Sequence, residues 1–227
     1  MFVDAHVHTS GISWCSRVSP VELAEICVRD GLDAVVLTNH CKKGYIEGIS
    51  YEDWRVKYVE NYESTKKAGE QLGLQVIFGI EVTPLCLNNI DFLLYGLTEE
   101  IFLDSPPLYE LTQKELYEYA VENDALLYQA HPYRGGAVPQ DPVYMHGVEI
   151  NCHPLYQTNE RYRVTAFAEK HHLKLSCGSD YHGDTYKAHC GMILPDSVTD
   201  SVSFADCLRQ PRQCALVIHD IGGEVKP

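Results

Sequence analysis

The sequence predicts an α/β protein with a single domain, in which strands and helices alternate around a parallel sheet or barrel. Two observations lead to this fold class: short apolar runs recur along the chain, and helix-start signals lie between them. The 227 residues, of which 45% are hydrophobic, suffice for one domain with its own core. We assign residues 1–221 to this domain and expect residues 222–227 to form a loose tail.

Capping signals mark the expected helices. Ser19 at the N-cap, Pro20 at the first helical position and Glu22 at the third indicate a helix that ends near Gly31. The segment Tyr51–Leu72 is long, charged and periodic, and we expect its aromatic face to pack against the barrel. Further helices are expected at Thr112–Glu122, Asn159–His171 and Phe204–Leu208.

The apolar runs between these helices predict the strands. The first lies around Asp4–His8, close to the start of the chain. The others are expected at Ala34–Leu37, Gln75–Ile80, Ile90–Tyr95, Ala125–Ala130, Val148–Ile150, Leu173–Cys177, Met192–Leu194 and Ala215–Ile218. Cys41–Ser50 is expected to be a polar loop.

His6 and His8 are the first candidate functional residues. They are two positions apart in a strand, so both side chains can point to the same face. Two imidazoles on one face supply half of a tetrahedral metal shell. The alternative is a chance pair on a solvated strand, and the rest of the chain argues against it.

Ligand-type side chains recur at the ends of other predicted strands. In α/β barrels the carboxyl ends of the strands carry the chemistry. Buried imidazoles and carboxylates are costly unless they are paired or bind metal, and this mixture suits Zn, Mn or Fe. The set exceeds what one ion needs, so two or three divalent ions are expected. Its members are His6, His8, His40, Glu81, His131, Asn151–His153, Asp180 and His182, with Asp91 early in its strand.

The charge balance limits the partners. The chain has 18 Lys and Arg against 32 Asp and Glu, which gives a formal charge of −14. An acidic chain is a poor general binder of extended nucleic acid or anionic membrane. The beginning of the sequence has no basic segment followed by an apolar run, and the nine cysteines form no CxxC pair. We therefore expect a cytoplasmic protein with reduced thiols and no membrane span.

In combination, these motifs resemble the PHP family, named for polymerase and histidinol phosphatase. They occur in family order and span nearly the whole chain, with closest similarity to small stand-alone bacterial members. The matching motifs are Asp4-x-His6-x-His8-Thr9, Thr38-Asn39-His40, Gly79-Ile80-Glu81, Asp91-Phe92-Leu93-Leu94-Tyr95-Gly96, Gln129-Ala130-His131-Pro132-x-Arg134 and Gly178-Ser179-Asp180-x-His182.

The resemblance implies a distorted (β/α)7 TIM-like barrel and assigns the metal ligands. By this resemblance, a first ion is held by His6, His8, Glu81 and Asp180, with Glu81 bridging, a second by His40 and His182, and a third by His131 and Glu81 with Asp91. Two departures stand out. Asn39 replaces a frequent aspartate, and the loop Thr9–Cys15 lacks the acid or histidine of many members, where Cys15 could substitute.

The function expected from this set is metal-dependent hydrolysis of a small phosphomonoester, such as a histidinol-phosphate-like compound or a nucleotide. Arg134 could bind the phosphate bidentately, with a structural ion pair as the alternative. His153 could contact the substrate, and the catalytic groups are expected to be Glu81, Asp180 and His182. Three alternatives remain open: a phosphodiesterase acting on nucleotide ends, an amidohydrolase-type C–N hydrolase and a non-catalytic metal-stabilised module.

Overall fold

The computed structural model of the chain describes residues 1–153, 159–183, 190–210 and 214–218. The expected tail, 222–227, lies outside the described residues. The described strands are β1 (Phe2–Val7), β2 (Ala34–Leu37), β3 (His40–Cys41), β4 (Gln75–Val82), β5 (Phe92–Tyr95), β6 (Leu126–Gln129), β7 (Gly147–Asn151), β8 (Lys174–Gly178), β9 (Cys190–Ile193) and β10 (Ala215–Ile218). The helices are α1 (Pro20–Arg29), α2 (Tyr51–Leu72), α3 (Glu99–Leu103), α4 (Gln113–Glu122), α5 (Asn159–His171) and α6 (Ser201–Arg209), with short 3-10 turns at Lys43–Tyr45, Leu108–Glu110, Arg134–Gly136 and Pro142–Tyr144.

The strands form a nearly closed barrel. Their order in the sheet is β10-β9-β1-β2-β4-β5-β6-β7-β8, with β3 paired beside β4. The sheet curls until β8 returns to β1, where an isolated parallel bridge joins Val7 to Tyr181. The His8 N–H donates to the Tyr181 carbonyl at 3.0 Å, and the Asp180 N–H donates to the His6 carbonyl at 2.8 Å. Among the described residues, the ring β1-β2-β4-β5-β6-β7-β8 confirms the α/β barrel with seven strands.

The expectation that the strands run parallel is wrong for β5 and β9. β9 pairs antiparallel with β1 and β10, and β5 pairs antiparallel with β4 and β6, while β1-β2-β4 and β6-β7-β8 are parallel. Residues Thr83–Asp91 contain no helix, and a short connection of this kind allows antiparallel pairing without a crossover. The reversal places Asp91, just before β5, at the same end of the barrel as the carboxyl end of β4.

Capping and periodicity predicted most helix boundaries. Ser19 and Glu22 form the expected capping box of α1, and Thr112 with Glu115 form that of α4. Gly73 ends α2 in the left-handed conformation, at a φ of 78°. Two elements were not expected: α3, which begins at the N-cap Thr98, and β3, which lies where a polar loop was predicted.

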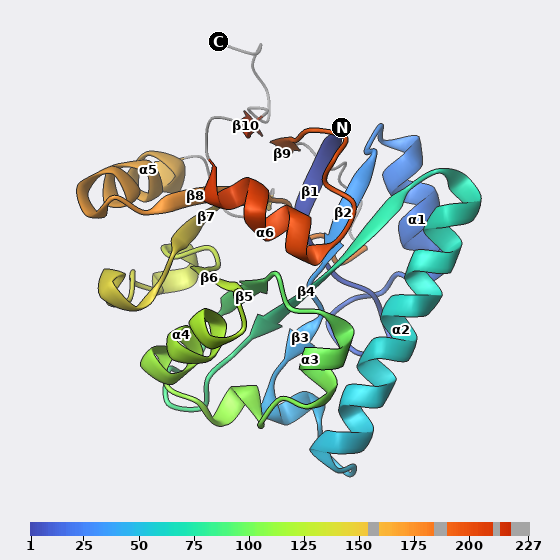
Figure 1. Cartoon of the computed structure of the whole chain (residues 1–227), viewed down its shortest axis with the longest axis horizontal. Helices are drawn as coiled ribbons and strands as arrows, with labels where there is room; N and C mark the ends of the chain where they lie inside the picture. The colour runs from blue at the N-terminus through green and yellow to red at the C-terminus, as the bar shows by residue number, and fades with distance from the viewer. Residues whose placement is uncertain (154–158, 184–189, 211–213, 219–227) are drawn as a thin grey trace.

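Two apolar cores hold the helices to the barrel. Val35 and Leu37 of β2 belong to the core formed with α1 and α2, which includes Trp54, whereas Val36 belongs to the core that contains Phe204 of α6. This alternation is the period of two that a strand imposes. In Figure 1, α1 and α2 lie side by side along one flank, α4 and α5 lie on the opposite flank, and α6 lies in front of the strands.

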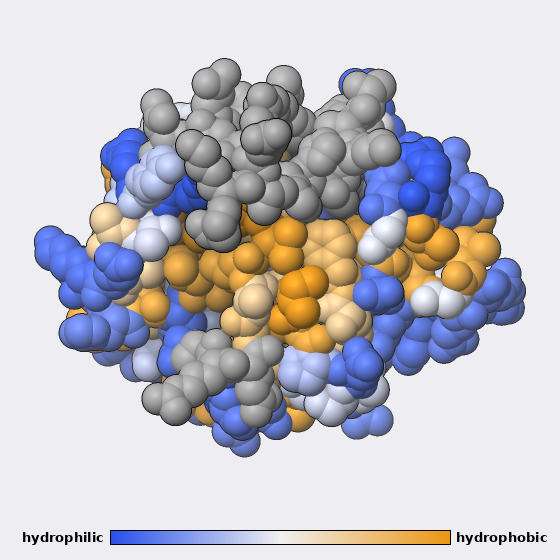
Figure 2. Space-filling view, turned by 90° about the horizontal axis from the view of Figure 1, so that it is seen from above, coloured by the Kyte–Doolittle hydropathy of each residue, from blue (hydrophilic) through white to orange (hydrophobic). Residues whose placement is uncertain are grey.

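The molecule has an apolar area on one face, at the end where β1 begins. Figure 2 shows apolar residues at the centre of this face, with hydrophilic residues along both margins. His6 and His8 lie near the other end of β1, so this face is distinct from the candidate site. No helix in the described part of the chain is long and apolar enough to cross a membrane.

The seam between β1 and β8 depends on a buried carboxylate and a glycine. Asp4 accepts hydrogen bonds from the backbone N–H groups of His6 (3.1 Å) and Ser179 (2.9 Å), and from the Ser179 hydroxyl. Burial raises the pKa of Asp4 to about 7, although these hydrogen bonds oppose the rise. A Cβ atom on Gly178 would stand 2.4 Å from the His6 Cβ, so only glycine allows this approach.

We expect Gly178→Ala to destabilise the protein by about 1–3 kcal/mol, because the added methyl group must push β8 away from β1. The free energy of unfolding, from urea denaturation, is the measurement. Gly44→Ala is the matched control, since no heavy atom lies within 4 Å of its added Cβ. Equal stability of the two variants would contradict the close packing of the seam.

Candidate metal centre

The eight residues predicted as metal ligands lie together at the carboxyl end of the barrel strands. Their ligand atoms fall into three groups, within each of which all atoms lie within 4.8 Å of one another. We call them the central group (His6, His8, Glu81 and Asp180), the histidine group (His8, His40 and His182) and the carboxylate group (Glu81, Asp91 and His131). The one difference from the expected sets is that His8 faces both the central and the histidine groups.

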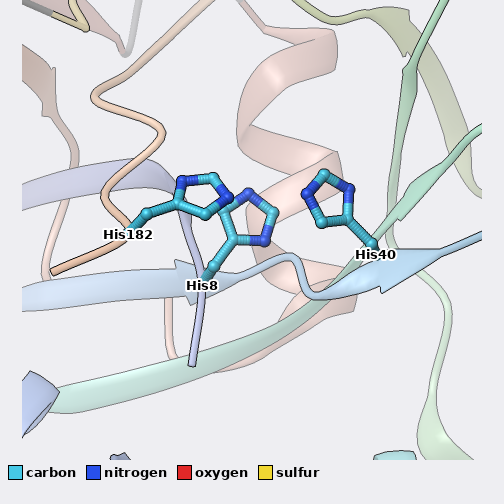
Figure 3. Close-up of side chains that lie close together, drawn as sticks. All are labelled: His8, His40 and His182. Atoms are coloured by element: carbon cyan, nitrogen blue, oxygen red, sulfur yellow. The ribbon is translucent and has the colours of Figure 1, made fainter. Parts of the chain in front are cut away.

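The histidine group shows how separate segments converge. In Figure 3 the rings of His8, His40 and His182 point toward one another from the end of β1, from β3 and from the segment after β8. The centroid of the His8 ring lies 4.4 Å from the centroid of the His40 ring and 4.2 Å from that of the His182 ring. His40 also lies directly opposite Glu81 in the pairing of β3 with β4, which joins the histidine and central groups.

Two of the site residues have an uncommon backbone conformation. His131 and Asp180 have φ values of 29° and 56°, in the left-handed region that side chains other than glycine rarely adopt. Such a conformation costs about 1–3 kcal/mol and persists where the surrounding structure enforces it. His131 lies two residues after the end of β6 and Asp180 two residues after the end of β8, at the end of the barrel where the site is.

Glu81 lies at the centre of the site and is completely buried. Its Oε2 atom lies 2.7 Å from Nδ1 of His40, 3.3 Å from Nε2 of His6 and 3.4 Å from Nε2 of His8, while Oε1 lies 3.2 Å from Nε2 of His131. Burial raises the pKa of Glu81, but His40 and His6 outweigh burial and hold that pKa well below its ordinary value. Glu81 is therefore a carboxylate in this site.

The short distances at Oε2 of Glu81 are not hydrogen bonds, unlike the contact of Oε1 with His131. Within the described structure, Nε2 of His6, Nε2 of His8, Nδ1 of His40 and Oε2 of Glu81 are buried without a hydrogen-bond partner. Buried polar atoms of this kind are rare, and each one calls for an explanation. Lone pairs that converge without pairing fit a bound cation, and imidazole with carboxylate is a donor set that suits Zn, Mn or Fe.

The hydrogen-bond partners of Nδ1 in His6 and His182 also fit a site that binds a metal ion. Nδ1 of His6 lies 2.7 Å from Oε1 of Glu149, and Nδ1 of His182 lies 2.8 Å from the Asp180 carbonyl. A carbonyl only accepts, so Nδ1 of His182 carries a proton, and in the neutral imidazole its Nε2 keeps a lone pair. The contact of His6 with a carboxylate favours the same tautomer, which presents Nε2 to a metal.

Asn39 fixes the tautomer of His8 through Ser13. Oδ1 of Asn39 accepts the Ser13 hydroxyl at 2.8 Å and the Thr9 N–H at 2.8 Å. The Ser13 hydroxyl has therefore used its proton, and its contact at 3.2 Å with Nδ1 of His8 makes that nitrogen the donor. Ser13 also accepts the His40 N–H at 3.0 Å. The asparagine that departs from the family pattern thus positions two predicted ligands without being one of them.

Asp91 is held at the entrance of the carboxylate group. Its Oδ1 accepts a hydrogen bond of 2.5 Å from the Thr83 hydroxyl, and its Oδ2 lies 3.8 Å from Nε2 of His131. The sequence predicted that Asp91 lies early in its strand, but Asp91 directly precedes β5. Only the antiparallel direction of β5 brings this side chain to the metal-binding end of the barrel.

Glu149 is a site residue that sequence reasoning did not assign, and it acts together with Asn151, which the sequence placed among the strand-end candidates. Both lie in β7, and Oε2 of Glu149 accepts the His131 N–H at 3.0 Å and the Asn151 amide at 3.1 Å. Glu149 is completely buried. The signal that could have found it is the acid in the middle of the apolar run Val148–Ile150.

Arg134 lies beside the central group and lines an adjoining cavity. It forms an ion pair with Asp180 and donates to Oδ1 of Asn151 at 2.5 Å. Together with Asp91 and His131 it also lines a cavity of about 440 Å³. His153 is buried, and its N–H donates to Oδ1 of Asn151 at 3.0 Å. The predicted roles of Arg134 and His153 in substrate binding stay predictions.

Cys15 lies beside the histidine group. Burial raises the pKa of this thiol, but hydrogen bonds with His182 and His40 outweigh burial and lower that pKa to about 6. The loop after the first motif, which lacks an acid or histidine, therefore brings a sulfur atom to the two histidines that the sequence assigned to the second ion.

Comparison with known proteins identifies solved structures that share this fold. No protein-family model matches the chain, and no curated protein matches it. One similar structure is that of a two-domain protein from Bacteroides vulgatus, which contains a predicted PHP-like metal-dependent phosphoesterase. Its TM-score to this chain is 0.70 and its sequence identity is 20%, and the match covers 96% of this chain and 65% of that one. The chain therefore spans about two thirds of that protein.

Two further solved structures have the same fold. One is a proposed metal-dependent phosphoesterase from Bifidobacterium adolescentis, with a TM-score of 0.58 and 17% identity over 98% of both chains. The other is a lesion-specific endonuclease from Pyrococcus furiosus, with a TM-score of 0.61 and 14% identity over 95% of this chain and 57% of that one. The barrel is thus of the kind found in PHP-like proteins.

We expect Glu149→Gln to weaken divalent metal binding about 10- to 100-fold, as is typical when the partner of a ligating histidine is changed. One oxygen of Glu149 faces Nδ1 of His6 and the other accepts two N–H donors, so an amide leaves one of these contacts unsatisfied. Titration of metal-free protein with Mn²⁺ or Zn²⁺ measures the change. Glu118→Gln, at an exposed helical position, is the control. Unchanged affinity would remove Glu149 from the metal centre.

Proposed function

We propose that the protein is a metal-dependent hydrolase that cleaves small phosphomonoesters. The observation that carries this proposal is the convergence of eight ligand-type side chains in three groups, two of which share the carboxylate of Glu81, next to a cavity lined by Arg134. Shared carboxylates are typical of sites with several metal ions, and a metal cluster beside an arginine suits a phosphoryl group. The PHP-like fold is compatible with this chemistry, but a shared fold alone does not determine a function.

Two or three divalent ions, of Zn, Mn or Fe, are proposed as cofactors. The central group would hold one ion, the histidine group a second and the carboxylate group a third, with Glu81 shared. Bound there, such ions supply Lewis acidity toward a phosphoryl oxygen and lower the pKa of water.

The residues of the chain itself would bind the substrate and move protons. Arg134 is held in place by Asp180 and Asn151 while it lines the cavity, so it can donate to a phosphate bound there. His182, whose Nδ1 proton is bonded to a backbone carbonyl, presents Nε2 to the site and could accept a proton. Asp180 and Glu81 complete the proposed catalytic set, and His153 is proposed to contact the substrate.

The charge and the cavity favour a small substrate. A chain of formal charge −14 repels the backbone of an extended nucleic acid, whereas the metal ions would attract a single phosphate locally. The cavity of about 440 Å³ has the size typical of small-molecule sites. Phosphodiester ends and C–N bonds remain the alternative substrates. The nine free cysteines fit a reducing compartment, and we propose a cytoplasmic location.

Glu81→Gln should lower metal content and reduce phosphomonoesterase activity by at least about 100-fold, because it removes the charge shared by all the imidazoles around it. Elemental analysis and an assay before and after chelation measure both effects, and Mn²⁺ or Zn²⁺ should restore the chelated native protein. Glu118→Gln is again the control. Metal without phosphomonoesterase activity would favour a phosphodiester or C–N substrate. Absence of metal under every loading condition would favour the non-catalytic module.

Arg134→Ala should lower kcat/KM for phosphomonoesters about 10- to 100-fold, the equivalent of one charge-assisted hydrogen-bond pair. Arg134→Lys should recover part of the loss, because it keeps the charge but not the planar fork. Metal content must be measured alongside, since Arg134 also pairs with Asp180. Loss of metal in Arg134→Ala, with recovery of both metal and activity in Arg134→Lys, would instead identify Arg134 as a structural ion-pair partner.

A further inference from the structure

Three cysteines form a cluster separate from the candidate metal centre. Cys152 directly follows β7, Cys177 lies in β8 and Cys190 begins β9. Their sulfur atoms all lie within 4.8 Å of one another, and those of Cys152 and Cys177 are 3.9 Å apart. Sequence reasoning did not predict this cluster, because the three residues are far apart in the chain and belong to no CxxC motif.

We propose that Cys152, Cys177 and Cys190 form a three-thiolate site for Zn²⁺. A disulfide requires sulfurs about 2.05 Å apart, whereas two thiolates on one tetrahedral zinc ion, with bonds of about 2.3 Å, lie about 3.8 Å apart. The observed 3.9 Å between Cys152 and Cys177 is the separation of two ligands on one ion. No carboxylate or imidazole belongs to this group, so its donors are uniformly soft and select a thiophilic metal.

Burial and charge favour zinc over a monovalent ion. Cys177 and Cys190 are completely buried, and Cys152 is half-buried, which leaves one side of the cluster open to an entering ion. Binding would release three thiol protons and leave a net charge of −1 with Zn²⁺, compared with −2 with Cu⁺. A buried site tolerates the smaller charge better.

The present hydrogen bonds of the cluster show which protons would leave. The Cys190 thiol donates to the Gly178 carbonyl at 3.2 Å, and the Cys177 thiol approaches the Val217 carbonyl at 3.9 Å. Cys152 is the half-buried sulfur of the three and is therefore the one that an entering cation reaches first, and the thiols would deprotonate as the ion binds.

A metal ion bound by these three cysteines would cross-link the strands β7, β8 and β9. β7 and β8 are paired in the ring, whereas β9 pairs with β1 and β10. An ion bound to all three sulfurs would therefore connect two sides of the seam where β8 meets β1. The site is distinct from the proposed catalytic function, and its zinc would be structural.

Cobalt provides the test, because Co²⁺ replaces Zn²⁺ and gives a near-ultraviolet charge-transfer band only when sulfur is a ligand. The reduced, metal-free full-length protein is titrated with Co²⁺, and Zn²⁺ is then added in competition. We expect a sulfur-to-cobalt band that Zn²⁺ removes. Glu81→Gln should keep the band, which separates this site from the candidate metal centre and its nitrogen and oxygen ligands.

Cys152→Ser is the decisive variant, because the half-buried position should tolerate oxygen in place of sulfur. We expect its Co²⁺ affinity, read from the band, to fall by at least about tenfold, with an unchanged circular dichroism spectrum. Two controls should keep the native band: Cys86→Ser at an exposed position and Cys214→Ser, whose sulfur lies 3.1 Å from that of Cys207. Cys15→Ser removes the sulfur beside the histidine group, and the part of the band that depends on Cys152 should persist in this variant.

Three outcomes would overturn the proposal. The first is the absence of a sulfur-to-cobalt band in native protein that binds Co²⁺ elsewhere. The second is an undiminished band in Cys152→Ser. The third is loss of the band in Cys15→Ser or Cys214→Ser but not in Cys152→Ser, which would place the thiolate ligand at the histidine group or at the Cys207–Cys214 pair.

Discussion

The buried carboxylate of Glu81 is the constraint on which the rest of the structure depends. A single ionised group inside a protein is costly, and here the imidazoles of His6, His8, His40 and His131 surround it. These imidazoles reach Glu81 from the end of β1, from β3 and from the segment after β6, so the carboxyl end of the barrel is arranged around one side chain. The unpaired atoms at this point fit a bound cation, and this donor set suits a divalent metal ion.

The irregular features of the barrel all serve the position of these groups. Reversal of β5 brings Asp91 to the metal-binding end, and left-handed backbone at His131 and Asp180 bends two side chains into it. The seam between β1 and β8 requires glycine at position 178, because His6 and Asp180 must approach each other there. A regular parallel barrel would place these side chains elsewhere.

The sequence predicted the α/β barrel, and it picked out the ligand-type residues that the structure brings together, because both depend on local signals. Capping residues and apolar runs are local, and the ligands stand at strand ends, where the motifs can be recognised. The direction of β5 could not be predicted, since pairing between strands is a non-local property. Glu149 was missed because a strand pattern does not reveal which buried acid faces an imidazole. The cluster of Cys152, Cys177 and Cys190 was missed for the same reason: only the folded chain brings these residues together.

The charge of the site also explains why asparagine, rather than aspartate, fits at position 39. Glu81, Asp91, Glu149 and Asp180 already bring four carboxylates to the site, with Arg134 as the cation among them. The amide of Asn39 adds no charge, and its Nδ2 donates to Thr9 and Asn61, at 2.9 Å each, while Oδ1 accepts from Thr9 and Ser13. An aspartate could not make the two donated bonds and would increase the negative charge. Asparagine therefore orders the loop that carries Ser13 and Cys15, so that the tautomer of His8 is fixed by neutral groups and the carboxylates are kept for the metal ions.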